Sequence, residues 1–469
     1  MRSEGREPPV GGEPTRLRPD GGLPTAGESG FERAGDEGET GAAPDERAAD
    51  AAPADIPPAD IVPADIVPAD ASPPVAHVGE VAGAEPPPPD TAVAPTAEPT
   101  RAPTALPPVV EVEALDWEAV RERADPRRVR ARLRDAVERV ETLLDREGGP
   151  GLLFDADRDD ETDRALRVSS LPPDTPLWFV GDLHGDLLAL EAVLALARTS
   201  DGPPPYFVFL GDLFDDGAYG LEVLLRVFEL VAESPDAVCL LAGNHDEALG
   251  YNGARFTATV SPSDFSELLN AHLAHEWIAR AGKLAVRLFD RAPRALFLPD
   301  GLLAAHGGFP LADLHAELRA TGDWNHPQCL SDFVWTRAHP RARRKLPNRV
   351  SRGSQFGHED FAAFCALATE LGRPVTHMVR GHDHVEERWA VFPAYAAHPV
   401  LTTVALSRRL PRELFGPYVR VPTVARWVPG ALPQVHRLHL PGAMVEELYP
   451  EPAEASEGEG EGDAAEARA

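Results

Sequence analysis

The sequence predicts an α/β protein in which two mixed β-sheets pack face to face, with helices on the outside. Between residues 177 and 241, strand-like apolar runs alternate with helical runs in the order β-α-β-α-β. This order calls for a parallel or mixed sheet with ligands at the carboxyl ends of the strands. A short motif rich in Gly, Asp, Asn or His follows each strand-like run. Any one motif could be an ordinary turn, but the repetition makes the set specific.

The expected elements follow one another along the folded part. Asp125 and Pro126 have the character of an N-cap and a first-turn proline, and apolar residues then recur at helical spacing up to Gly148. This predicts an amphipathic helix that packs on the body as a lid or collar, with partner binding as the alternative. Strands are expected at 177–180, 206–210, 238–241, 295–298, 302–305, 376–379, 390–392, 400–405 and 435–440. Helices are expected at 187–197 and 221–232 and near 263–281 and 359–371.

Composition divides the chain into a folded body and two polar ends. Close to half of the 49 prolines precede Val110, and a Pro-Ala-Asp repeat runs through residues 53–70. Residues 1–115 have too little apolar surface to fold and are expected to form a disordered, extended arm. Residues 116–150 are expected to be a helical lead-in and residues 151–443 one large domain. Acidic residues and little apolar mass predict a disordered tail at 444–469.

Charge and cysteine usage narrow the class of protein. The formal net charge is −31, which argues against bulk affinity for nucleic acid or anionic lipid, because both attract basic surfaces. Cys239, Cys329 and Cys365 form no Cys-x-x-Cys pair, so neither a disulfide framework nor a zinc knuckle is indicated. We see no signal segment or membrane-length apolar run, and we expect a cytoplasmic protein.

Five short motifs carry the donor atoms of a two-metal site. They are Gly181-Asp182-Leu183-His184-Gly185-Asp186, Gly211-Asp212-Leu213-Phe214-Asp215-Asp216-Gly217, Gly243-Asn244-His245-Asp246, His306-Gly307-Gly308 and Gly381-His382-Asp383-His384. Asp182 and His184 leave a strand end two residues apart and can chelate one cation. Because a carboxylate has two oxygens, Asp212 can bridge two cations roughly 3.5–4 Å apart. The second ion is completed by Asn244, His306 and His382. His384 is an additional candidate ligand for the first ion.

The set of motifs resembles the signature of the calcineurin-like metallophosphoesterase superfamily, and most closely its bacterial PPP-type serine/threonine protein phosphatases. Three further segments resemble that group: Asp332-Phe333-Val334-Trp335, Arg352-Gly353-Ser354-Gln355-Phe356-Gly357 and Val379-Arg380-Gly381-His382. The resemblance covers residues from about 177 to 391. It implies the calcineurin-like phosphoesterase fold and two divalent metal ions, with Mn²⁺ expected and Fe or Zn as alternatives.

The resemblance also implies roles for individual residues. The implied metal ligands are Asp182, His184, Asp212, Asn244, His306 and His382. His245 would protonate the leaving oxygen and Asp215 would orient His245. Arg352 would match a phosphate-clamping arginine, and Asn244 is a second candidate for contact with the phosphate. A hydroxide held between the two metals would attack phosphorus directly, without a covalent phosphoenzyme.

Three departures from the protein-phosphatase pattern bear on the site. Asp216 stands where the family has a phosphate-binding arginine, and Arg337 stands where it has an aspartate. We hypothesise that the two have exchanged roles, which makes Arg337 a candidate for phosphate binding. His384 is absent from the PPP pattern but common in the wider superfamily, so it is a ligand, a group behind the ligands or part of a surface turn. Residues 401–409 lack the tyrosine-bearing loop of the eukaryotic enzymes.

The expected function is hydrolysis of phosphomonoesters, with phosphoserine and phosphothreonine of proteins as the leading substrates and small phosphoesters as the wider class. The same metals could act on a nucleotide, as in diadenosine tetraphosphate hydrolases, or on a phosphodiester. The non-enzyme alternative is a pseudophosphatase scaffold, motivated by Asp216 and the N-terminal arm. The arm is a candidate site for a protein partner, and neither nucleic acid nor a membrane is expected as one.

Overall fold

A computed structural model describes residues 106–146, 151–344, 353–413 and 419–450. Three features expected from the sequence therefore lie outside the described residues. They are the N-terminal arm up to residue 105, the acidic end from residue 451, and Arg352. Among the described residues, no helix combines the length and the apolar character that crossing a membrane requires.

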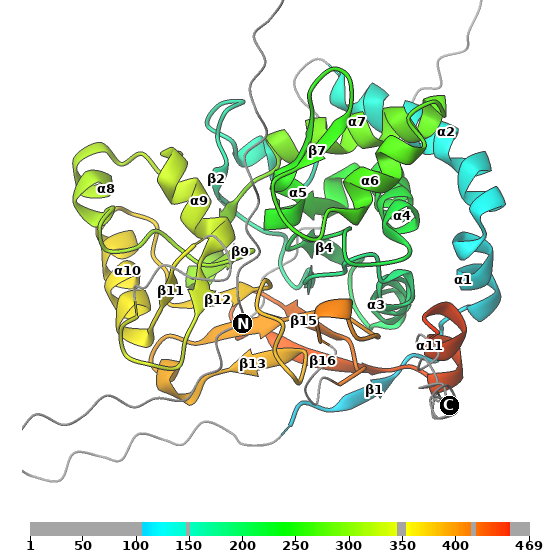
Figure 1. The fold of residues 1–469 in the computed structure, drawn as a ribbon. Helices are drawn as coiled ribbons and strands as arrows, with labels where there is room; N and C mark the ends of the chain where they lie inside the picture. Colours follow the sequence, from blue (N-terminus) through cyan, green and yellow to red (C-terminus); the bar gives the residue numbers. More distant parts are fainter. Residues whose placement is uncertain (1–105, 147–150, 345–352, 414–418, 451–469) are drawn as a thin grey trace, which may run out of the picture. The chain divides into compact units, whose positions relative to one another are not determined.

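Two six-stranded mixed sheets form the centre of the described part (Figure 1). The first has the order β1-β16-β15-β3-β4-β5, in which β3 (Leu177–Val180), β4 (Tyr206–Phe209) and β5 (Val238–Leu240) run parallel. The second has the order β13-β14-β12-β9-β8-β2, in which β12 (His377–Arg380) is parallel to β9 (Leu302–Ala305). The expected α/β fold with two mixed sheets and flanking helices is confirmed.

The other strands complete the two sheets and form two small pairs. In the first sheet they are β1 (Val109–Glu111), β15 (Thr423–Trp427) and β16 (Gln434–His439). In the second sheet they are β2 (Ala165–Arg167), β8 (Ala295–Phe297), β13 (Trp389–Val391) and β14 (Val400–Thr403). Two small pairs add β6 (Leu249–Tyr251) with β7 (Phe256–Ala258), and β10 (Arg337–Ala338) with β11 (Gln355–Phe356).

The two sheets pack against each other through alternate residues of their strands. Leu177 and Phe179 of β3 belong to a buried cluster that also holds Leu302 and Ala304 of β9. Trp178 of β3 points the other way, into a second cluster shared with the helices. Because side chains alternate between the faces of a strand, both faces of these strands are buried, which explains why they are continuously apolar in sequence.

Helices cover the outer face of each sheet (Figure 1). The first sheet is covered by α2 (Pro126–Leu144), α3 (Leu187–Thr199), α4 (Gly220–Glu233), α6 (Asp264–Ala271) and α7 (Glu276–Arg291). The second is covered by α8 (His315–Thr321), α9 (Pro327–Trp335) and α10 (His358–Glu370). The remaining helices are α1 (Trp117–Ala124), α5 (Asn244–Ala248) and α11 (Gly442–Leu448). The single helix expected near 263–281 is in fact two, because His275 caps a new helix by accepting from the Ile278 amide.

Helix α2 begins as the sequence predicts. The Asp125 side chain accepts from the Arg127 amide, and Pro126 occupies the first turn. Val129, Leu133 and other apolar residues on one face are buried against α4 and α7. The apolar face of α2 is therefore covered by the chain itself, in agreement with the collar interpretation.

Two elements lie in ranges that the sequence predicted to be disordered. Strand β1 falls within the expected arm of residues 1–115, and it pairs in parallel with β16. Helix α11 falls partly within the expected tail of residues 444–469, and its Val445 and Leu448 are buried. Both elements form because they find a partner surface far away in sequence, which local composition cannot reveal.

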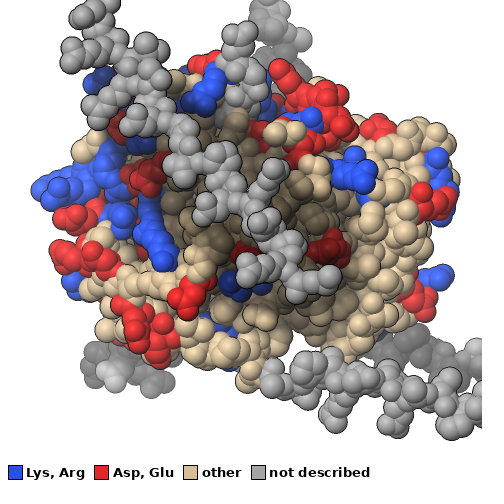
Figure 2. Space-filling model, turned by 180° about the vertical axis from the view of Figure 1, so that it is seen from behind, with Lys and Arg blue, Asp and Glu red and all other residues tan. Residues whose placement is uncertain are grey.

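Arginines along the edge formed by α1 and α2 are interleaved with carboxylates. Figure 2 shows the two kinds of charge gathered together there. A cavity of about 660 Å³ between α1, α2 and α4 is lined by six arginines and by Glu122, Asp135, Glu229 and Glu233. Arg132 pairs with Glu229 at 2.5 Å. This edge is therefore a surface of mixed sign rather than a uniformly basic one.

Glu222 in the first turn of α4 generates a prediction about stability and pH. Burial raises the pKa of Glu222 to about 7, from an ordinary value of 4.5. The unfolded chain therefore loses this proton at lower pH than the folded protein, and the folded state loses stability as pH rises from 4.5 to about 7. Glu222→Gln should stabilise the protein by about 1–2 kcal/mol more at pH 8 than at pH 5.

Urea denaturation at the two pH values measures this difference. Glu233→Gln, at the exposed end of the same helix, is the matched control and should change stability equally at both. A Glu222→Gln variant whose effect on stability does not depend on pH would contradict the prediction.

Candidate metal centre

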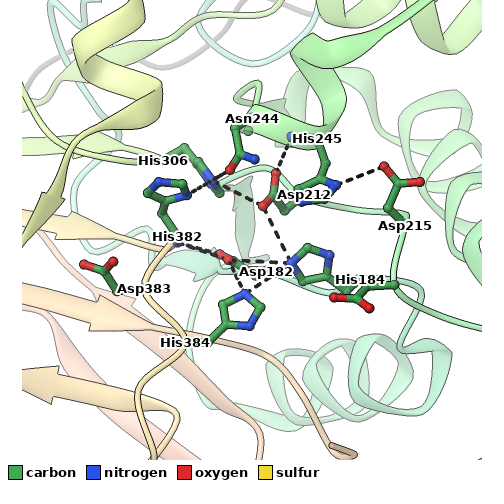
Figure 3. A network of polar contacts seen from close by, with 12 residues as sticks. Asp182, His184, Asp212, Asp215, Asn244, His245, His306, His382, Asp383 and His384 are labelled. Atoms are coloured by element: carbon green, nitrogen blue, oxygen red, sulfur yellow. Dashed lines mark hydrogen bonds and ion pairs between the residues drawn. The ribbon is translucent and has the colours of Figure 1, made fainter. Parts of the chain in front are cut away.

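The five motifs meet at the carboxyl ends of strands from both sheets. Asp182 follows β3, Asp212 follows β4, and Asn244 opens α5 after β5. From the second sheet, His306 follows β9 and His382 follows β12. Figure 3 shows these side chains pointing toward one another. The predicted convergence at strand ends is therefore present, and it joins the two sheets at one site.

The loops that carry these side chains bend through an uncommon backbone conformation. Five residues have φ between 43° and 66°: His184, Asp212, Asp215, Asp216 and His382. Left-handed conformations are several times more frequent for Asp, Asn and His than for other residues with a Cβ, and they cluster at functional sites. The bends at His184, Asp212 and His382 turn the chain sharply just past a strand, and these three side chains point into the site.

One group of donor atoms is formed by Asp182, His184 and His384. The His384 Nε2 atom lies 3.1 Å from Asp182 Oδ2 and 3.2 Å from His184 Nε2. The donor atoms of all three residues lie within 4.8 Å of one another. Ligands of a single cation, with bonds of about 2.0–2.2 Å, stand roughly 3–3.5 Å apart, so the spacing suits one ion.

A second group surrounds His306. Its Nε2 atom lies 3.1 Å from Asn244 Oδ1, 3.1 Å from His382 Nδ1 and 3.4 Å from Asp212 Oδ2. The His306 Nδ1 atom is 2.9 Å from the Leu210 carbonyl oxygen. A proton on Nδ1 would be donated to that oxygen, which leaves the Nε2 lone pair facing the other donors.

Asp212 lies between the two groups. Its Oδ1 atom accepts from the His245 amide at 2.9 Å. Its Oδ2 atom lies 3.6 Å from His184 Nε2 and 3.4 Å from His306 Nε2. The sequence predicts a carboxylate bridge with one oxygen for each cation. The structure instead turns the same oxygen toward both groups, because the other is occupied by the backbone.

The buried carboxylates and imidazoles shift the pKa values of one another. Burial alone would raise the pKa of Asp212, but the neighbouring imidazoles of His306 and His245 hold it well below its usual range. Burial alone would lower the pKa of His306, but Asp212 and Asp182 raise it to about 9. The site therefore concentrates negative charge that needs a positive partner, which protons or cations can provide.

Asp246 joins two of the loops at the site. Its oxygens accept from the backbone amides of Asp212 at 2.6 Å, Gly243 at 2.9 Å and Leu213 at 3.2 Å. Burial, together with the nearby charge of Asp212, raises the pKa of Asp246 to about 7. Asp246 thus holds the loop after β4 against the loop after β5.

Gly381 permits the close approach of the loop after β12 to Asp182. A Cβ atom at Gly381 would lie 2.1 Å from Asp182 Oδ1, far inside van der Waals contact. The next amide, that of His382, donates to the same oxygen at 2.9 Å. The absence of a side chain at Gly381 therefore allows the backbone to orient the carboxylate.

His245 stands at the edge of the two groups and is backed by a carboxylate. Its Nδ1 atom lies 2.9 Å from Asp215 Oδ2, and Asp215 Oδ1 accepts from the Phe265 amide at 2.9 Å. Burial raises the pKa of Asp215, although the His245 contact opposes the shift. A cavity of about 320 Å³ opens here, and its walls include Asn244, His245, Arg337, His382 and His384. His245 thus forms part of the wall of this cavity.

Comparison with known proteins agrees with this geometry. Residues 175–386 match the calcineurin-like phosphoesterase family. This part of the chain is a metallophosphoesterase domain. It is distantly related to the PPP-type serine/threonine phosphatases.

Two curated relatives illustrate the relationship. The serine/threonine-protein phosphatase PP2A-like PPG1 of Candida albicans is 25% identical over 224 residues, which are 46% of this chain and 49% of the relative. The serine/threonine-protein phosphatase 6 catalytic subunit of Drosophila melanogaster is 30% identical over 174 residues, which are 35% of this chain and 52% of the relative. The matches thus span about half the length of these relatives. Both are eukaryotic, so the bacterial part of the expectation has no support from them.

A solved structure also aligns with the chain. It is a protein serine/threonine phosphatase from Saccharomyces cerevisiae with similarity to human phosphatase PP5. The alignment covers 69% of this chain and 95% of that one, at 17% identity and a TM-score of 0.44.

The donor set of the metallophosphoesterase domain fits divalent metal ions. Three overlapping groups of His and Asp occur among the described residues: Asp182, His184 and His384; His184, Asp212 and His245; Asp212, His306 and His382. A mixture of imidazole and carboxylate ligands suits Mn²⁺, Fe²⁺ and Zn²⁺. Family and donor set together imply divalent metals, and the choice of Mn²⁺ stays a prediction.

Of the expected phosphate-binding residues, Arg337 lies at the cavity of the metallophosphoesterase domain. It donates to the His382 carbonyl oxygen at 2.9 Å and pairs with Asp383 at 3.0 Å. Asp216 is held by its backbone, since its carbonyl accepts from Arg408 at 2.8 Å. The described residues that line the cavity do not include Asp216. The exchange of roles between Asp216 and Arg337 stays a hypothesis.

Sequence reasoning missed two groups behind the site of the metallophosphoesterase domain. Arg408 donates to the backbone carbonyls of His184 and Asp216. Glu413 contacts the outer nitrogen of His384. Neither residue belongs to one of the donor motifs or lies at a regular sequence interval from the candidate ligands. No signal in the sequence could have found them.

Proposed function

We propose that this protein hydrolyses phosphomonoesters with two divalent cations, and that its substrates are phosphoserine and phosphothreonine in proteins. Asp182, His184 and His384 would hold one cation. Asn244, His306 and His382 would hold the other, with Asp212 shared between them. The observation that carries the proposal is the contact of the two donor groups through one oxygen of Asp212, with His245 beside them.

The chemistry of such a site divides between the cations and the side chains. When bound, two divalent ions supply Lewis-acid stabilisation of the phosphoryl group and activate water as the nucleophile. His245 would donate a proton from Nε2 to the leaving oxygen, while Asp215 holds the opposite nitrogen in place. Arg337 and Asn244 would bind phosphate oxygens from the wall of the cavity.

Two features favour an alkyl phosphomonoester as the substrate. The alkoxide of serine or threonine is a poor leaving group, so it gains most from a positioned acid such as His245. A monoester also carries more negative charge than a diester, which suits the guanidinium of Arg337. Similarity to serine/threonine phosphatases of yeast and fly supports the same class.

The decisive experiment compares three substrates with the full-length, manganese-loaded protein. These are a phosphoserine/phosphothreonine peptide, diadenosine tetraphosphate and a bis-aryl phosphodiester. The peptide should have the highest kcat/KM, and Asp212→Asn should abolish its turnover, which excludes a contaminant. A preference for either of the other substrates would replace the proposed function. Bound metal without hydrolysis would indicate a pseudophosphatase scaffold.

His245→Asn tests the general acid. The substitution should lower kcat on a phosphoserine peptide by about 10²–10⁴. It should affect p-nitrophenyl phosphate much less, because that leaving group needs no proton. Metal content should not change, and Asp215→Asn should cause a smaller loss in the same direction. Equal losses on both substrates, or loss of metal, would reject this role.

Arg337→Ala tests phosphate binding. Losing a charge-assisted hydrogen bond should raise the KM for a phosphomonoester roughly tenfold. Arg343→Ala is the control, because Arg343 is exposed and pairs with Glu359 at 2.7 Å. Metal content is measured alongside, since Arg337 also contacts the loop of His382. An unchanged KM would count against phosphate binding by Arg337.

A further inference from the structure

His384 is contacted from both sides of its ring. On the inner side, Nε2 lies 3.1 Å from Asp182 Oδ2 and 3.2 Å from His184 Nε2, as Figure 3 shows. On the outer side, Nδ1 lies 3.2 Å from Glu413 Oε1. The His384 side chain is 11% exposed and that of Glu413 only 3%. The contact between His384 and Glu413 is therefore mostly buried.

Glu413 is itself held in place by several donors. Arg388 donates to both of its carboxylate oxygens, at 2.7 Å and 2.8 Å. The Leu410 amide donates to Oε2 at 3.0 Å. A carboxylate in a fixed position therefore faces His384.

Arg388 is likewise anchored, which makes the arrangement rigid. Its side chain is fully buried. Besides Glu413, it donates to the carbonyl oxygens of Val419 at 3.0 Å and Arg408 at 2.9 Å. The two-pronged contact between guanidinium and carboxylate leaves Glu413 little freedom to turn away from His384.

We propose that Glu413, anchored by Arg388, is a positioning residue that holds His384 with its Nε2 lone pair directed at Asp182 and His184. A carboxylate can only accept a hydrogen bond, so the proton of a neutral His384 would be on Nδ1. The unprotonated nitrogen would then be Nε2, which faces Asp182 and His184. Glu413 would thereby set the affinity of one of the two cation sites. The inference rests on the proposed function, because it presumes that cations bind there.

A double-mutant cycle on the full-length protein tests this role. Manganese binding is measured by titration calorimetry for the wild type, Glu413→Gln, His384→Asn and the double variant. Glu413→Gln should weaken one of two manganese sites by about 10–100-fold and leave the other unchanged. The double variant should bind no more weakly than His384→Asn alone, because Glu413 acts only through His384. Glu387→Gln is the control, since Glu387 is an exposed carboxylate that lies 4.0 Å from Arg437, and it should bind like the wild type.

Other outcomes would overturn the inference. If Glu413→Gln lowers the melting temperature but keeps wild-type manganese affinity, the Glu413–Arg388 pair is only structural. Additive losses in the double variant would mean that Glu413 acts independently of His384. If Glu413→Gln does not fold, the same cycle is carried out with Glu413→Asp. The shorter aspartate keeps a negative charge for Arg388 but withdraws the carboxylate from His384 Nδ1.

The experiment also separates this inference from the proposed function. A wild type that binds two manganese ions and hydrolyses the phosphopeptide, with Glu413→Gln unchanged, would defeat only the positioning role. A wild type that binds two ions but does not hydrolyse the peptide would defeat the proposed substrate. The role of Glu413 would still be supported in that case if the double variant bound manganese no more weakly than His384→Asn alone. A wild type that binds no manganese would overturn both.

Discussion

The rest of this structure depends on holding buried carboxylates and imidazoles together beside one cavity. Asp182, Asp212, His306 and His382 are each at most 2% exposed. A buried charge is stable only when it is paired and hydrogen-bonded. The loops therefore leave the strands through left-handed bends, and backbone amides are used to fix the carboxylates, as the His245 amide fixes Asp212. Fold and site are shaped by the same requirement.

Three further carboxylates support the site, and each of them connects it to a different segment of the chain. Asp246 joins the loops after β4 and β5, and Asp215 joins His245 to the start of α6. Asp186 accepts from Ser407 and from the hydroxyl of Tyr449 at 3.1 Å, which brings the end of α11 to the loop after β3. The site is thus supported from most of the described chain, including its C-terminal helix.

The metallophosphoesterase domain is similar in sequence to serine/threonine phosphatases. In its structure His384 lies among the donor atoms with Asp182 and His184. Arg337 reaches the wall of the cavity from β10, while the carbonyl oxygen of Asp216 accepts from Arg408.

The sequence alone determined the strands whose apolar runs end at a donor motif, and the bounds of β3 and β9 agree with the prediction. It also predicted the candidate donors, because metal binding and proton transfer demand particular side chains just after a strand. Only the tertiary structure decided that β15 lies between β16 and β3, that α6 and α7 are separate, and that Glu413 reaches His384 across 29 positions in the chain. The physical reason is that periodicity and local motifs record how a segment folds on itself, whereas these contacts arise from partners distant in sequence.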